Sequence, residues 1–112
     1  MLVPRLVRSV REGLPIRVAG SAGFRFTPTH VSDAVRAVQA ALRLDGRHVI
    51  NVGGPEVLTL RAACEAIAAE LGVAPVFEET NDEPADLVPD LALMSELLGS
   101  PKVGFAAGVG TL

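Results

Sequence analysis

Apolar residues recur at helical spacing in three long stretches of the chain. The stripes are Val3, Leu6, Val7, Val10 and Leu14; Val31, Ala34, Val35, Val38 and Leu42; and Leu60, Ala63, Cys64, Ile67, Ala68 and Leu71. A repeat of three or four residues is typical of a helix that buries one face. The pattern therefore predicts three amphipathic helices.

Residues suited to helix ends bound these stripes. Ser32 or Asp33 can accept a backbone N–H bond at the start of the second helix, and Thr59 can do so for the third. Gly72 stands where a left-handed residue ends a helix. A fourth, shorter helix is expected after Asp90. Its apolar face would hold Leu91, Met94, Leu97 and Leu98.

Short apolar runs between the helices predict strands. The candidates are residues 16–18, 24–26, 49–52, 57–58 and 75–77. Residues 49–52 have the composition of a buried strand that ends in a glycine turn. Residues 78–89 are acidic and aperiodic, and they are expected to form a loop. Helices that alternate with strands predict an α/β fold, with about four helices and a few short strands in a single domain of residues 1–112.

The composition restricts the class of protein. Hydrophobic residues make up 49% of the chain, with four Phe and neither Trp nor Tyr, and the mean hydropathy is +0.40. We therefore expect some apolar surface to face another protein or another copy, as in a homo-oligomer. No apolar stretch reaches the ~18 residues of a membrane span. The single Cys fits a reducing compartment, so we expect a cytoplasmic protein that binds neither membranes nor nucleic acid.

Charge is divided unevenly between the two halves of the chain. Residues 1–61 hold nine Arg and four acids, whereas residues 62–101 hold nine acids and no basic residue. The first half could attract an anion, and the second would repel one. Ordinary solvated surfaces and mutual attraction between copies explain this division equally well.

A glycine pair raises the question of a nucleotide site. In HVINVGGPEVLTL, an apolar run enters Gly53-Gly54 and a helical pattern follows. A dinucleotide fingerprint needs a third glycine and a later acid, so a tight connection is favoured over a phosphate loop. His30, His48 and Cys64 lack metal-ligand spacing, and Cys64 lies on an apolar stripe typical of a core residue.

Arg25 is the strongest candidate for contact with an anion. It stands between Phe24 and Phe26, after a glycine loop and before a helix. A guanidinium there can hold two phosphate or carboxylate oxygens. The alternative is an edge-strand Arg in solvent, which the residues alone favour. The acids of residues 78–90 lack the glycine-centred order of a calcium loop, which favours a solvated loop.

Four segments of the chain stand in an order and spacing typical of one family. They are MLVPRLVRSVREGLPIRVAG, FRFTPTHVSDAVRAV, HVINVGGPEVLTLRAACEAIAAELG and PADLVPDLALMSELLGSPKVGFAAGVGTL. Together they resemble the C-terminal half of extended short-chain dehydrogenase/reductases, the NAD-dependent epimerase/dehydratase family of nucleotide-sugar enzymes. The second resembles the family's Arg-aromatic stretch before a V-x-D helix start. The third resembles the block with a strand ending in N-x-G, a Thr cap and a helix ending in Leu-Gly.

The resemblance implies a partial fold, the substrate-side C-terminal portion of an extended dehydrogenase/epimerase. The N-terminal dinucleotide-binding domain would be absent from this chain, so no cofactor is expected here, although NAD or NADP is implied for a full-length parent. The family's catalytic Tyr-Lys pair has no counterpart, since the chain has no Tyr. The expected substrate is a nucleotide-sugar-like anion, contacted by Arg25, or by Arg17 in its place, with His30 lining the site.

Two functions follow as alternatives. The chain is either the substrate-binding portion of an epimerase or dehydratase, not catalytic on its own, or a stand-alone, non-enzymatic module that oligomerises. In the parent fold, the stripe from Val31 to Val38 and the run 49–52 would pack against the missing half.

Overall fold

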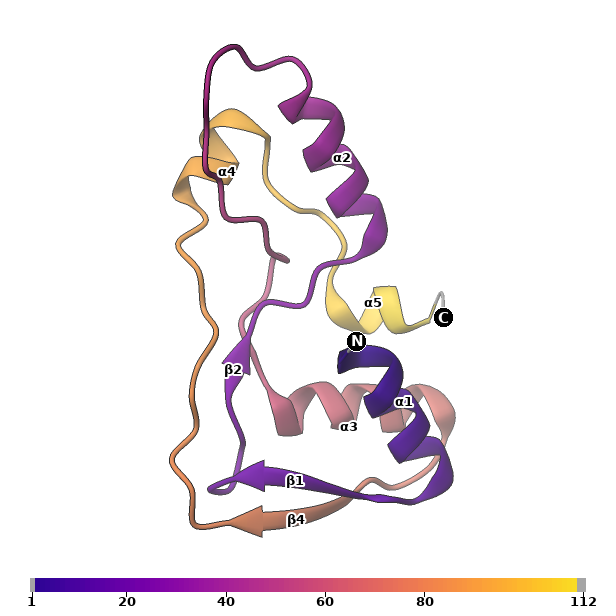
Figure 1. Ribbon diagram of the computed structural model, residues 1–112. Helices are drawn as coiled ribbons and strands as arrows, with labels where there is room; N and C mark the ends of the chain where they lie inside the picture. The colour runs from indigo at the N-terminus through magenta and orange to yellow at the C-terminus, as the bar shows by residue number, and fades with distance from the viewer. Residues whose placement is uncertain (1, 111–112) are drawn as a thin grey trace.

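The computed structural model describes residues 2–110, which form five helices and four short strands (Figure 1). The helices are α1 (Leu2–Glu12), α2 (Val31–Ala41), α3 (Leu60–Leu71), α4 (Ala92–Leu97) and α5 (Phe105–Val109). The strands are β1 (Pro15–Ala19), β2 (Arg25–Phe26), β3 (Leu58–Thr59) and β4 (Val76–Thr80). This mixture of helices and short strands confirms the predicted partial α/β fold.

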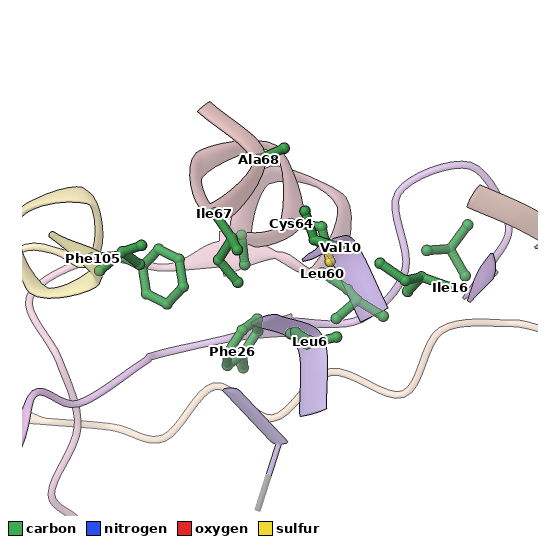
Figure 2. Packing of buried hydrophobic residues seen from close by; sticks show 12 residues of the cluster. Leu6, Val10, Ile16, Phe26, Leu60, Cys64, Ile67, Ala68 and Phe105 are labelled. Atoms are coloured by element: carbon green, nitrogen blue, oxygen red, sulfur yellow. The ribbon is translucent and has the colours of Figure 1, made fainter. Parts of the chain in front are cut away.

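The main core lies between the helices α1 and α3 and the strand β1. Ile16 and Val18 are buried on one face of β1, while Pro15 and Arg17 are exposed on the other, as the two-residue period of a strand requires. Figure 2 shows the side chains of α3 lying between Phe105 and Ile16. The cluster consists of Leu6, Val10, Ile16, Val18, Phe26, Leu60, Ala63, Cys64, Ile67, Ala68, Phe105 and Val109.

The strand β1 pairs in parallel with β4, in a register that places Ile16 beside Phe77 and Arg17 beside Glu78. The strand therefore continues to Thr80, and the prediction that the loop begins at residue 78 was wrong. Pairing with β1 satisfies the backbone of residues 78–80, and opposite charges stand side by side across the strands. These non-local contacts outweigh the acidic composition of the segment.

A second, smaller sheet joins β2 to β3 in antiparallel pairing, with Arg25 opposite Thr59 and Phe26 opposite Leu58. Leu87, which lies beyond β4 in the sequence, adds one further contact to this smaller sheet. The Leu87 N–H donates to the Arg25 carbonyl oxygen at 2.8 Å, and Leu87 forms a parallel bridge with Phe26. The acidic segment is thereby held beside β2.

Two predicted helix ends are confirmed. The Thr59 hydroxyl accepts the Ala62 N–H at the start of α3, and Gly72 ends the helix with φ of 70°. The cap of α2 differs from the prediction. His30 is the N-cap residue, and its Nδ1 accepts the Ser32 N–H at 3.1 Å.

Ser32 and Asp33 do not cap α2 because both lie inside its first turn. The Asp33 side chain instead reaches a distant part of the chain. Its Oδ1 accepts the Lys102 N–H and its Oδ2 accepts the Val103 N–H, both at 2.9 Å. Asp33 is only 2% exposed, and it also pairs with Arg36. At the start of α4, Asp90 Oδ1 accepts the Ala92 N–H at 2.9 Å.

The segment 49–52 is not a strand, and the prediction of a buried strand there was wrong. Val49 is 93% exposed, and among residues 2–110 no strand lies beside this segment to pair with it. Figure 1 shows α2 and the loop that follows it standing apart from α1, α3 and the β1–β4 sheet. The apolar stripe of α2 is likewise exposed, at Val31, Val35, Val38 and Leu42.

Candidate functional site

The strand β2 presents Arg25 to solvent and its two neighbours to the core. Phe26 is buried, Phe24 packs against the same cluster, and their ring centroids are 5.5 Å apart. The Arg25 side chain is 58% exposed and points the other way, because residues alternate across a strand. The two Phe residues therefore pack this backbone against the core and leave Arg25 on the exposed face.

The Arg25 guanidinium is held by the carboxylate of Asp86. Asp86 Oδ2 accepts from Arg25 Nε at 3.0 Å and lies 3.0 Å from Nη2, while Oδ1 accepts the Arg25 backbone N–H at 2.8 Å. The backbone hydrogen bond and then the guanidinium lower the pKa of Asp86 below its ordinary value of 3.8. Asp86 is thus charged at neutral pH, and Arg25 is positioned before any ligand arrives.

Sequence reasoning missed this partner. Asp86 lies 61 residues from Arg25, in a segment with no period and several other acids. No local pattern distinguishes it from Glu83 or Asp82. Only the bridge between Phe26 and Leu87 brings the acid beside the guanidinium. A hollow of about 570 Å³ opens next to the pair, lined by Phe26, Thr27, Asp86, Leu87, Val88 and Pro89.

The ion pair leaves part of Arg25 available for an anion. Asp86 occupies the side of the guanidinium formed by Nε and Nη2. A planar guanidinium has a second pair of donors, on Nη1 and Nη2, that can bind an oxyanion. The arrangement can therefore bind one further oxyanion, although Asp86 reduces the net positive charge there.

His30 lies in a different depression of the surface. The groove has a volume of about 370 Å³ and runs between the first turn of α1, residues 28–31 and α5. Most of its lining is apolar, including Val3, Pro4, Phe105 and Val109. The His30 Nδ1 lies 2.7 Å from Ser32 Oγ, so the ring is fixed in orientation by the helix that it caps.

Arg17 stands apart from both. It lies on the exposed face of β1, beside Glu78 of β4. The groove at His30 is lined by neither Arg25 nor Arg17, and the hollow at Asp86 is lined by neither Arg17 nor His30. The three predicted site residues therefore occupy separate parts of the surface of this chain.

The glycine pair forms a tight crossing of two chain segments. A Cβ at Gly54 would stand 1.6 Å from the Pro28 carbonyl oxygen, and one at Gly53 would stand 2.7 Å from Thr27 Oγ1. The Gly54 N–H donates to the Thr27 carbonyl oxygen at 3.3 Å. The space that a pyrophosphate would need is thus filled by the backbone of residues 27–28. These glycines do not fit a dinucleotide cofactor.

Cys64, the single thiol of the chain, is a buried residue of the main core. Burial, and secondarily the charge of Glu65, raise the pKa of the Cys64 thiol to about 11, so the reactive thiolate is scarce at neutral pH. Within residues 2–110, no three metal-ligating side chains gather in one place. Every helix of this described part is too short or too polar to cross a lipid bilayer.

Comparison with solved structures identifies the fold. The chain matches UDP-glucuronic acid 4-epimerase from Bacillus cereus, in complex with NAD, with a TM-score of 0.81 and 25% identity over 98% of this chain. It matches the UDP-glucose 4-epimerase of Thermus thermophilus, also in complex with NAD, with a TM-score of 0.76 and 29% identity over 96% of this chain. UDP-glucose 4-epimerase from Thermotoga maritima matches in fold, with a TM-score of 0.79 and 21% identity over 98% of this chain.

The match covers only part of each of these enzymes. This chain spans 36%, 37% and 37% of the three chains, respectively. No family model matches the sequence, and no curated protein does. The structural matches confirm the resemblance that the sequence predicts: the chain has the fold of a portion of an extended short-chain dehydrogenase/reductase of the epimerase/dehydratase kind.

Proposed function

We propose that residues 1–112 form the C-terminal, substrate-side portion of an NAD- or NADP-dependent epimerase or dehydratase that acts on nucleotide sugars. The observation that carries this proposal is the match of nearly the whole chain to a part of three 4-epimerases. In this proposal, the chain is one domain, and the dinucleotide-binding domain belongs to a longer parent protein.

The division of chemistry between the two domains follows from the residues. The family that this chain resembles transfers protons with a Tyr and a Lys three residues later, and this chain has no Tyr. The family binds its cofactor at an open glycine loop, whereas Gly53 and Gly54 are packed against residues 27–28. Cofactor binding and catalysis are therefore assigned to the rest of the parent, and substrate binding to this portion.

Arg25 is the residue that we assign to the anionic part of the substrate. A nucleotide sugar carries a diphosphate, whose oxygens suit a guanidinium. Asp86 holds the side chain in a fixed orientation, so less rotamer freedom is lost when the ligand binds. His30 and Arg17 are assigned secondary contacts, which would require the rest of the parent to enclose the site.

The test is substitution of Arg25 in the longer protein that carries this segment. Arg25→Ala should weaken binding of UDP-glucose or UDP-glucuronic acid by about 1.5–3 kcal/mol, the scale of a hydrogen bond to a charged group. Arg25→Lys keeps the charge but loses the fork, and it should give an intermediate loss. The thermal midpoint should change little, because the Arg25–Asp86 pair is accessible to solvent and exposed ion pairs add little stability.

A matched control is Arg8→Ala. Arg8 is also exposed and also pairs with one carboxylate, that of Glu12, but it lies on α1, away from β2. It should leave substrate affinity unchanged. Equal affinity in the Arg25→Ala and Arg8→Ala proteins, or a loss that follows unfolding, would return Arg25 to the role of a solvent-exposed surface residue.

A second function rests on a different observation. The exposed apolar stripe of α2 favours a module that acts by associating with other protein surfaces rather than by binding a substrate. In this alternative, the chain is a non-enzymatic module that keeps the shape of the enzyme portion and oligomerises. The two functions are distinguished by the Arg25 substitution and by sedimentation of the 112-residue chain, which should be oligomeric in the alternative.

A further inference from the structure

The carboxylate of Asp86 offsets the positive charge of Arg25 at the point where an anion would bind. It meets Arg25 at three nitrogen atoms, the backbone N at 2.8 Å and the side-chain Nε and Nη2 at 3.0 Å each. None of the residues that line the adjoining hollow is basic. Within residues 2–110, a ligand at this hollow therefore meets one positive and one negative group in direct contact with each other.

The charge on the ligand decides how much this offset matters. The proposed function, on which this inference rests, gives Arg25 a nucleotide sugar as its ligand. The diphosphate of a nucleotide sugar is substituted at both ends, so each of its phosphates carries a single negative charge. A free nucleoside diphosphate ends instead in a phosphate with two negative charges above pH ~6, where the second proton of a monosubstituted phosphate is lost. The two ligands differ at the group that a guanidinium binds.

The geometry of the ion pair sets how strongly Asp86 acts on that second charge. Asp86 lies on the Nε–Nη2 edge of the guanidinium, and an oxyanion on the Nη1–Nη2 edge would lie on the neighbouring edge of the same plane. In water, one extra ligand charge at ~4 Å from the guanidinium gains about sixfold in affinity, and at ~7 Å from the carboxylate it loses about threefold. Asp86 thus cancels more than half of the binding free energy that the second charge would gain.

We infer that Asp86 is a specificity-determining residue of the Arg25 site, which offsets the advantage of a doubly charged terminal phosphate over the singly charged phosphates of a diphosphate substituted at both ends. Positioning and selection are two effects of the same carboxylate. Fixing the guanidinium helps every oxyanion alike, whereas the charge of Asp86 opposes each ligand in proportion to the ligand's own charge. A free nucleoside diphosphate therefore competes with the nucleotide sugar less well than it would at Arg25 alone.

The test compares the dissociation constants of UDP and UDP-glucose in the longer protein that carries this segment. The titrations are made without divalent cations and at ~10 mM salt, where charges are little screened. Asp86→Asn should shift the ratio of the two constants by about threefold in favour of UDP. The loss of positioning weakens both ligands alike, so the ratio isolates the charge. Asparagine keeps an oxygen for the Arg25 backbone N–H, and Asp86 is exposed, so the variant should fold.

Glu12→Gln is the matched control. Glu12 also accepts from an exposed arginine, Arg8, but it lies on α1, away from β2, so its loss should leave the ratio unchanged.

The pH profile separates the charge of Asp86 from a structural role. Below pH ~6 the terminal phosphate of UDP carries one negative charge. Asp86 stays charged there, because the backbone hydrogen bond and then the guanidinium of Arg25 lower its pKa below 3.8. The other charged groups next to Asp86 in space or in sequence are Arg25, Asp82, Glu83 and Asp90. Side chains of these types change charge little between pH ~5 and ~7.5, so the shift should be full near pH ~7.5 and nearly absent near pH ~5.

Two results would overturn the inference and leave the proposed function standing. One is a ratio that Asp86→Asn does not shift, or that Glu12→Gln shifts equally, while Arg25→Ala still weakens the binding of UDP-glucose. The other is a shift of the same size near pH ~5 and near pH ~7.5, since the charge of the terminal phosphate would then play no part. An Arg25→Ala protein that binds UDP-glucose as tightly as the wild type would instead overturn the proposed role of Arg25, and the selection by Asp86 with it.

Discussion

Replacing Asp33 by Asn should detach α2 from the C-terminal segment. Asp33 is 2% exposed, and its two oxygens accept the backbone N–H groups of Lys102 and Val103, each at 2.9 Å. Asparagine has the same shape, but one of its two terminal atoms is a donor. One of the two backbone N–H groups therefore loses its acceptor and faces an N–H₂ group instead.

The cost can be worked out from these contacts. Loss of one buried hydrogen bond to a charged group costs about 1.5–3 kcal/mol. Loss of the ion pair with Arg36, whose side chain is half exposed, adds up to about 1 kcal/mol. The free energy of unfolding should fall by about 1.5–4 kcal/mol in total. For a chain of this length, the thermal midpoint should fall by about 6–16 °C.

Urea denaturation and amide exchange of the 112-residue chain measure this effect. Exchange should accelerate in α2 and in residues 101–104 more than in α3. Asp45→Asn is the control, because the exposed Asp45 carboxylate takes part in no hydrogen bond among residues 2–110. A loss below about 0.5 kcal/mol in the Asp33→Asn protein, the range of ordinary surface changes, would refute the reasoning.

The same contact predicts how stability depends on pH. Burial raises the pKa of Asp33, but hydrogen bonds from Lys102, Val103 and Arg36 outweigh it, so the folded pKa lies below 3.8. The unfolded chain thus binds a proton more readily. The contribution of Asp33 is complete above pH ~4 and is lost as the pH falls through the folded pKa. The Asn variant should lack this part of the acid-induced loss, and an identical acid profile in both proteins would contradict the assignment.

Three further predictions concern packing, reactivity and cofactor binding. Gly54→Ala should lower the free energy of unfolding by more than about 2 kcal/mol, because its Cβ would stand 1.6 Å from the Pro28 oxygen. Gly46 has open space around it but a φ of +81°, so Gly46→Ala should cost about 1–2 kcal/mol. Equal urea midpoints for the two variants would contradict this prediction. Cys64, with a pKa of about 11, should react with a thiol reagent at pH ~8 only in denaturant, and fast labelling of the native chain would show otherwise. Calorimetric titration of the isolated chain with NAD(H) or NADP(H) should detect no site with a dissociation constant below about 100 μM, or about −5.5 kcal/mol. Saturable binding with a smaller dissociation constant would contradict the assignment of the cofactor to the rest of the parent.

Local signals predicted the elements that depend on local physics. The helices α1 and α3 follow from their apolar period, and the ends of α3 follow from the Thr59 cap and the left-handed Gly72. Both caps depend on residues within one helical turn, so they can be predicted from the sequence alone. The alternation of Phe24, Arg25 and Phe26 across the strand β2 was predictable for the same reason.

Contacts between distant residues could not be predicted in this way. The pairing of β4 with β1 extended a strand through Glu78 and Glu79, although Glu is a residue type depleted in strands. Asp86 is one of several acids in its segment, and only the fold selects it as the partner of Arg25. His30 caps α2, while Asp33 lies inside the first turn and accepts the distant backbone N–H groups of Lys102 and Val103. The run 49–52 remained unpaired because a strand needs a neighbour that residues 2–110 do not supply.

The last two of these differences concern α2 and the way in which it is attached. The main core cluster contains no residue of α2, and the buried residues of this helix are Asp33 and Ala37 rather than its valines. Polar contacts of Asp33 and the close crossing at Gly54 therefore hold this part of the chain in place. An apolar stripe kept outside the core, beside an unpaired extended segment, is what a surface needs when another protein body completes it. The α1–α3 core therefore stabilises the fold, whereas the apolar stripe of α2 lies outside that core and is exposed.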